Sequence, residues 1–207
     1  EIMRPIVAQE KSAFNFREVM DNGKILIINL SKGRLGELNS SLIGLIIVGK
    51  LLMASLSRTD ISESERRDFY LYIDEFQNVT TRSIATILSE ARKYRLDLII
   101  AHQFLGQLEE GIKKAVFGNI GSTAAFRIGA EDAEFMANQF QPVFETQDLI
   151  NIDNYHAYMK LLISGQTSQP FNMRTYPPGP KDPDQAERSK DYSRMRYGRP
   201  REEVEAE

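Results

Sequence analysis

Residues 69–78 read Phe-Tyr-Leu-Tyr-Ile-Asp-Glu-Phe-Gln-Asn, an apolar and aromatic run that ends in two adjacent carboxylates. Such a run can be buried on both faces, as in a parallel sheet that is covered by helices. Asp74 and Glu75 then follow the carboxyl end of the strand, which is where open α/β sheets bind their ligands. Taken alone, the pattern fits a catalytic edge and a solvated Asp-Glu turn about equally well.

The residues that follow favour the catalytic edge. Apolar residues recur at helical spacing from Ile84 to Ala91, and the cations of 92–95 suit a helix C-terminus. A second buried strand, 96–101, comes next and leads into Gln103. Because a strand–helix–strand unit of this length has a right-handed crossover in nearly all cases, its two strands are parallel. We therefore expect the acid pair and the amide of Gln103 at one edge, where they can bracket a terminal phosphate.

The rest of the chain predicts one α/β domain over residues 1–176. The expected elements are strands at 24–30 and 122–128, helices at 38–57, 105–116 and 130–140, and a terminal hairpin of 155–164 with 171–176. With the strand–helix–strand unit they predict a mainly parallel sheet with helices on both faces.

Residues 177–207 differ in character from the rest. They are charged and hold almost no large aliphatic residues, so they cannot bury enough surface to offset ordering entropy, and we expect a disordered tail. Cations interleaved with Tyr192 and Tyr197 could contact single-stranded nucleic acid. A solvated tail is the favoured interpretation, because four glutamates at 202–207 cancel much of the charge.

A phosphate-binding loop of the form Gly-x-x-x-x-Gly-Lys-Ser/Thr does not occur in the 207 residues. The nearest match, 44–51, has Leu51 in place of the hydroxyl and falls within the helix expected over 38–57. The chain also begins at Glu1 rather than at a methionine. We therefore expect the C-terminal part of a longer protein, with the phosphate loop and its central strand upstream. The strand before Gln103 should then have an open edge, and the isolated chain should bind ATP poorly.

Composition sets looser bounds. The 207 residues, 42% hydrophobic and 27% charged, suffice for one globular core. The absence of Cys excludes disulfides and thiolate metal sites and suits a reducing cytoplasm. A net charge of −3 and a pI near 5.6 argue against a broadly basic nucleic-acid surface. No signal peptide is evident, and the longest apolar run, interrupted by Lys50, is expected to be too short to span a bilayer.

Several stretches resemble the ATPase domain of type IV secretion and conjugation coupling proteins of the TraD/TraG type, within the RecA-like group of hexameric DNA translocases. The resemblance runs from about Arg4 to about Tyr176. The residues that carry it are Asn29-Leu30-Ser31-Lys32-Gly33, Tyr72-Ile73-Asp74-Glu75-Phe76-Gln77-Asn78, Leu88-Ser89-Glu90-Ala91-Arg92-Lys93-Tyr94, Ala101-His102-Gln103-Phe104, Gly118-Asn119-Ile120-Gly121, Phe126-Arg127-Ile128-Gly129 and Asp132-Ala133.

The resemblance implies a RecA-like P-loop NTPase fold, with ATP and Mg²⁺ as cofactors. It implies that Asp74 binds the metal and with it the nucleotide, and that Glu75 activates the attacking water. It implies that Gln103 senses the γ-phosphate and that Arg92 reaches into the neighbouring subunit as an arginine finger. From the residues alone, Arg92 is a solvated cation at a helix end. Arg127, at the end of its strand, is a further candidate phosphate-binding or inter-subunit cation, with a structural ion pair as the plainer alternative.

The function so implied is ATP-driven movement of DNA, with single-stranded DNA as the favoured form, or of a DNA–protein cargo, through a homo-hexameric ring. Relaxosome or secretion-channel proteins would be its partners. The ring would lie at the cytoplasmic face of the inner membrane, held there by segments outside this chain. Two alternatives stay open, namely an ATPase that powers pilus or protein secretion, and a non-enzymatic docking module for an accessory DNA-binding protein.

Overall fold

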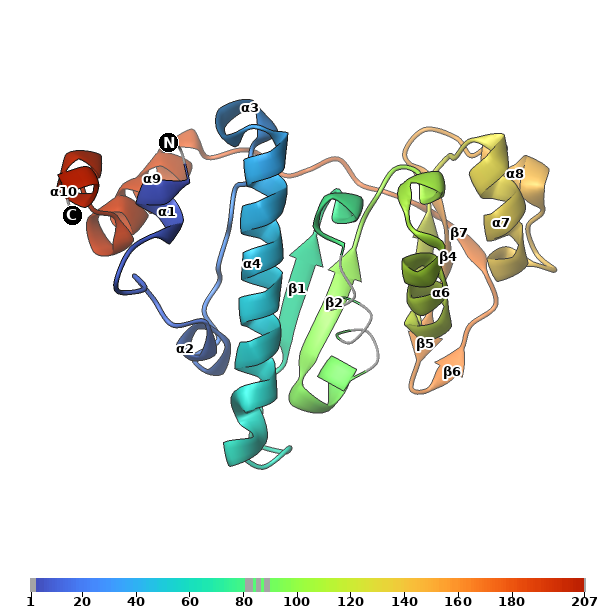
Figure 1. Cartoon of the computed structure of the whole chain (residues 1–207). Helices are drawn as coiled ribbons and strands as arrows, with labels where there is room; N and C mark the ends of the chain where they lie inside the picture. Colours follow the sequence, from blue (N-terminus) through green and yellow to red (C-terminus); the bar gives the residue numbers. More distant parts are fainter. Residues whose placement is uncertain (1–2, 81–83, 85–86, 88–89, 207) are drawn as a thin grey trace. The chain divides into compact units, whose positions relative to one another are not determined.

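The computed structural model describes residues 3–80, 84, 87 and 90–206 (Figure 1). The chain divides into two compact units. Unit 1 comprises Glu1–Tyr70, Lys93–Asp97 and Gly179–Glu207, and unit 2 comprises Leu71–Arg92 and Leu98–Pro178.

Strands β1 (Phe69–Ile73) and β2 (Leu96–Ile100) pair in parallel, as predicted (Figure 1). The Phe69 N–H donates to the Arg95 carbonyl at the start of the pair, and the Ala101 N–H donates to the Ile73 carbonyl at its end, both at 2.9 Å. Within the described residues these two strands pair only with each other. Each therefore has an open edge, where a further strand can add.

In unit 1, the helix predicted over 38–57 is confirmed as α4 (Glu37–Leu56). It follows three short helices, α1 (Arg4–Val7), α2 (Phe16–Asp21) and α3 (Lys32–Leu35), and continues as the 3₁₀ turn η1 (Ser57–Asp60). Residues 44–51 lie inside α4, so this near match to a phosphate loop is a helix segment, as expected.

The helix formed by α4 and η1 is longer than the sequence suggested. It comprises 24 residues, Glu37–Asp60, and contains an 18-residue window with a mean hydropathy of 1.8, so by length and composition only it suffices to cross a membrane. The expectation that this run is too short was wrong, because about 20 helical residues already cover the roughly 30 Å of a bilayer core. Part of the helix lies in the core of unit 1, where Ile43, Val48 and Leu51 are buried. Core helices of soluble proteins can have the same length and apolar composition.

The strand predicted over 24–30 is not formed. This segment has no regular secondary structure and pairs with no strand in the described part of the chain, and Ile25 and Ile27 are 91% and 87% exposed. The apolar, β-branched run favours a strand, yet such a preference is realised only where a partner strand supplies hydrogen bonds and packing.

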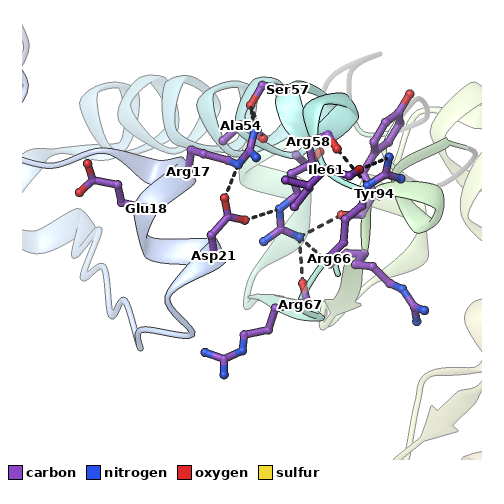
Figure 2. Close-up of polar contacts among 12 residues, drawn as sticks. Arg17, Glu18, Asp21, Ala54, Ser57, Arg58, Ile61, Arg66, Arg67 and Tyr94 are labelled. Atoms are coloured by element: carbon purple, nitrogen blue, oxygen red, sulfur yellow. Dashed lines mark hydrogen bonds and ion pairs between the residues drawn. The ribbon is translucent and has the colours of Figure 1, made fainter. Parts of the chain in front are cut away.

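A polar cluster at the end of α4 links separate segments of unit 1 (Figure 2). The Arg58 side chain is fully buried, and its Nε lies 2.9 Å from Asp21 Oδ1. Its Nη1 donates to the carbonyls of Arg67 and Tyr94, at 2.9 and 3.0 Å. Burial lowers the pKa of the Arg58 guanidinium, and the charge of Asp21 opposes that shift. The cluster therefore ties α2, η1 and the segment before β2 to one guanidinium group.

Unit 2 contains an antiparallel sheet in the order β3-β4-β7. Its strands are β3 (Thr123–Ala125), β4 (His156–Lys160) and β7 (Phe171–Arg174), and a small hairpin, β5 (Leu162–Ile163) with β6 (Gln166–Thr167), lies between β4 and β7 in sequence. The predicted terminal hairpin is confirmed. The prediction of a mainly parallel sheet is wrong for the described strands, because alternation and apolar runs identify strands without fixing their direction.

The helices of unit 2 are α6 (Glu110–Asn119), α7 (Ala130–Phe140) and α8 (Thr146–Ile150), with 3₁₀ turns η2 (Phe76–Val79), η3 (Ala91–Tyr94, whose last two residues belong to unit 1) and η4 (Leu105–Gln107). The helix predicted over 130–140 is confirmed as α7. In the helix predicted between the two parallel strands, Ile84 and Ile87 are helical and buried. Residues 81–83, 85–86 and 88–89 of that prediction lie outside the described residues.

The C-terminal segment contains two helices, α9 (Pro183–Tyr197) and α10 (Arg201–Ala206), where a disordered tail was expected. Asp182 caps α9 by accepting the Gln185 N–H at 2.9 Å, and Pro183 suits the first helical position. Lys190 and Arg194 pair with acids one turn away. The expectation rested on the lack of apolar burial, and every residue of α9 is indeed exposed. The cap and the ion pairs stabilise α9 locally, without burial of apolar surface.

Candidate functional site

The chain turns sharply where β1 ends. Glu75 has φ 50° and ψ 46°, the left-handed conformation that non-glycine residues rarely adopt. Its N–H donates to Asp74 Oδ1 at 2.9 Å, and the next N–H, that of Phe76, donates to the Ala101 carbonyl at 3.0 Å. The Phe76 ring is fully buried. The pairing with β2 and this buried ring fix the turn, so the strained residue is held in place by its neighbours.

The ends of β1 and β2 meet at the side chain of Glu75. Gln103 Nε2 donates to Glu75 Oε1 at 2.6 Å, and Gln77 Nε2 donates to Glu75 Oε2 at 2.7 Å. The sequence predicted the first of these neighbours from the parallel pairing of the strands. It gave no role to Gln77, although that residue lies in the stretch that carries the resemblance. Each carboxylate oxygen keeps a further lone pair, so Glu75 can still accept a hydrogen bond from water.

Asp74 is exposed beside this cluster. In the part of the chain that the structure describes, no three His, Cys, Asp or Glu side chains gather closely enough to hold a metal ion. This donor set does not build a protein cage, but it fits Mg²⁺, which is commonly held by one or two carboxylates together with substrate phosphates and water. The Gly-x-x-x-x-Gly-Lys-Ser/Thr motif of a phosphate-binding loop does not occur in the 207 residues.

The two candidate arginines are not part of the Glu75 cluster in the described structure. Arg92 lies in η3 and is exposed. Arg127 Nη2 donates to Asn154 Oδ1, which is 27 residues away in sequence, at 3.0 Å. Neither observation tests the roles assigned to them, which stay predictions.

Asp132 supports the loop that follows Gln103. Its Oδ2 accepts the N–H of Leu105 at 3.0 Å, and Leu105 is itself buried. The first turn of α7 is thereby joined to the chain just after the sensor candidate. Spacing along the sequence gave no signal for this contact, because 27 residues separate the two partners.

Comparison with known proteins gives matches only among solved structures. No protein-family model matches the chain, and no curated protein matches it. The fold is similar to that of the bacterial conjugative coupling protein TrwBdeltaN70 in its unbound form, with a TM-score of 0.65 and 17% identity over 79% of this chain and 43% of that chain. The chain thus spans less than half of the TrwB chain.

A second similar structure is the genome packaging NTPase B204 from Sulfolobus turreted icosahedral virus 2, in complex with AMPPCP. The TM-score is 0.50, with 14% identity over 76% of this chain and 71% of that chain. At such identities the likeness concerns the fold. The chain has an α/β fold similar to those of this coupling protein and this packaging NTPase.

Proposed function

We propose that this chain is part of an ATPase that moves DNA, or a DNA–protein cargo, through a ring of subunits in type IV secretion or conjugation. The observation that carries the proposal is the contact of Glu75 with Gln103, 2.6 Å across the ends of two parallel strands. A water-activating acid and a phosphate-sensing amide have to lie within reach of one terminal phosphate, and this geometry provides that.

The proposed chemistry is phosphoryl transfer from ATP to water. Mg²⁺ bound to the triphosphate would supply charge neutralisation, and Asp74 is the residue that would hold it. Glu75 would orient the attacking water and accept its proton. Gln103 would donate to the terminal phosphate and so report whether that phosphate is present. Arg92 would approach the nucleotide of the neighbouring subunit, consistent with its exposure.

The comparisons support a translocase-type NTPase, because the similar folds are those of a coupling protein and a genome packaging NTPase. Nucleotide binding is supported by the ATP analogue in the second structure. A homo-hexameric ring, relaxosome or secretion-channel partners, single-stranded DNA as cargo and attachment at the cytoplasmic face of the inner membrane belong to the proposal. The phosphate loop would come from sequence outside this chain.

The test is ATP hydrolysis by the complete gene product, measured with and without single-stranded DNA. We expect hydrolysis that DNA stimulates several-fold. In the same assay, mixing Arg92→Ala subunits with Glu75→Gln subunits should restore part of the activity, because each variant supplies the residue that the other lacks at a shared interface.

The alternatives give different results in this assay. Hydrolysis that does not respond to DNA would favour an ATPase for pilus or protein secretion, which the net charge of −3 suits better. No hydrolysis under any condition would contradict the proposal and favour a docking module.

A further inference from the structure

The carboxylate of Glu75 has two amide donors, and they differ in kind. Gln103 follows β2, is exposed, and reaches Glu75 across the sheet from 28 residues away. Gln77 is two residues from Glu75 in the same turn and is partly buried. The contact with Gln77 is therefore local and does not depend on where the chain after β2 lies.

The orientation of the Gln77 amide is set by Glu75. An ionised carboxylate is an acceptor only, so the NH₂ group has to face it. The Oε1 atom of Gln77 is then directed away from the carboxylate, where it is buried without a hydrogen-bond partner among the described residues. The reversed amide would bring Oε1 against the carboxylate, two acceptors in contact. The Gln77 amide thus donates to Glu75 while its Oε1 has no hydrogen-bond partner among the described residues.

In the proposed reaction the two donors behave differently, because Gln103 also has to reach the terminal phosphate. When Gln103 turns to that phosphate, its contact with Glu75 Oε1 is released. One oxygen of Glu75 is then free to take the water, while the other stays bound to Gln77. The side chain that has to be oriented for proton transfer would still have one fixed end.

We propose that Gln77 is a positioning residue, which keeps Glu75 oriented when Gln103 leaves it for the terminal phosphate. This inference rests on the proposed function, since it assigns Gln77 to the same site. It predicts a loss in turnover without a loss in nucleotide binding.

The test compares three variants of the complete gene product, Gln77→Ala, Gln103→Ala and Asn78→Ala. Asn78 is the matched control, because its Nδ2 donates to the main-chain carbonyl of Glu75 and thus supports the same turn through the backbone. For each variant, kcat, the Kd values for ATP and ADP, and the melting temperature are measured.

We expect Gln77→Ala to lower kcat by about 10- to 100-fold, as is typical when a partner that orients a reacting side chain is lost. Its Kd for ATP and its ratio of ATP to ADP affinity should stay within about 2-fold of the wild type, since the substitution leaves uniform binding intact. Gln103→Ala should instead lose discrimination between ATP and ADP. Asn78→Ala should retain kcat even where it lowers the melting temperature.

Failure of this inference differs from failure of the proposed function. If the wild type hydrolyses ATP, Glu75→Gln does not, and Gln77→Ala turns over like the wild type, the role of Gln77 is overturned alone. Equal losses of kcat in Gln77→Ala and Asn78→Ala, with equal losses in melting temperature, would also overturn it, because Gln77 would then only support the turn. A wild type without ATPase activity overturns both proposals.

Discussion

Glu75 is the residue at which backbone strain and the proposed chemistry coincide. A left-handed conformation costs an L-residue roughly 1–2 kcal/mol, so it persists only where the surroundings fix it. Here the Phe76 N–H bonded to Ala101 and the buried Phe76 ring fix it. The conformation directs the carboxylate to Gln103 and Gln77. Glycine would adopt this backbone conformation without strain, but it has no carboxylate. The strained glutamate is therefore consistent with a role for its side chain.

At the same scale, the structure predicts a pH response at Tyr158. Its ring stacks on Phe144 with 3.7 Å between centroids, and burial, with smaller effects of the charges of Asp148 and Asp153, raises the pKa of the phenol above its ordinary value of 10.0. The pKa of Tyr158 is higher in the folded than in the unfolded state. Its contribution to the free energy of unfolding is therefore complete below about pH 10 and is lost as the pH rises through the folded pKa.

Absorbance titration near 295 nm should therefore show a phenol that ionises late and disappears in Tyr158→Phe, a change that retains the stacked ring. Tyr176→Phe, at a 93% exposed position, is the control and should not remove it. A Tyr158→Phe titration that keeps the late component would contradict the assignment.

At the scale of elements, unit 1 depends on polar contacts as well as on its apolar core. Arg58 binds Asp21 of α2 and the carbonyls of Arg67 and Tyr94 (Figure 2). Arg66 adds a contact from its Nη1 to the Lys93 carbonyl at 2.6 Å. The carbonyls of Lys93 and Tyr94 belong to the two residues that directly follow Arg92 in sequence. The sequence did not reveal Arg58 as a buried residue, because a buried arginine cannot be identified without knowing its partners.

We predict that Arg58→Ala lowers the free energy of unfolding by about 3 to 5 kcal/mol, since it removes one partner of a buried ion pair and leaves carbonyl groups unpaired. Urea denaturation of the chain measures this. Arg67→Ala is the matched control, because Arg67 gives the cluster only its main-chain carbonyl, and it should cost no more than about 0.5 kcal/mol. Equal effects of the two substitutions would show that the Arg58 cluster does not stabilise unit 1.

At the scale of the whole molecule, the sequence predicted what local patterns determine. The parallel pair β1–β2, helices α4 and α7 and the terminal hairpin were predicted because their spacing is regular. The closeness of Glu75 and Gln103 followed from the parallel pairing. Strand direction in β3-β4-β7 and the unpaired state of 24–30 depend on contacts between distant segments, which spacing does not encode. Gln77 was missed because its role depends on a turn whose left-handed residue is not glycine.

The open edges of β1 and β2 also belong to this scale. Among the described residues, neither strand has a second neighbour, and the apolar segment 24–30 pairs with no strand. The chain matches 43% of TrwB, and its sequence holds no phosphate loop. Because the proposed function draws the phosphate loop from sequence outside this chain, the proposal is tested on the complete gene product.

The central claim is that the acid at the end of β1 and the amide at the end of β2 serve one ATP molecule. The most direct measurement is ATP binding and hydrolysis by Glu75→Gln in the complete gene product. The account predicts that this variant binds ATP with a Kd within about 2-fold of the wild type, while hydrolysis falls by about 10²- to 10⁴-fold through loss of the general base. Hydrolysis at the wild-type rate by Glu75→Gln would contradict it.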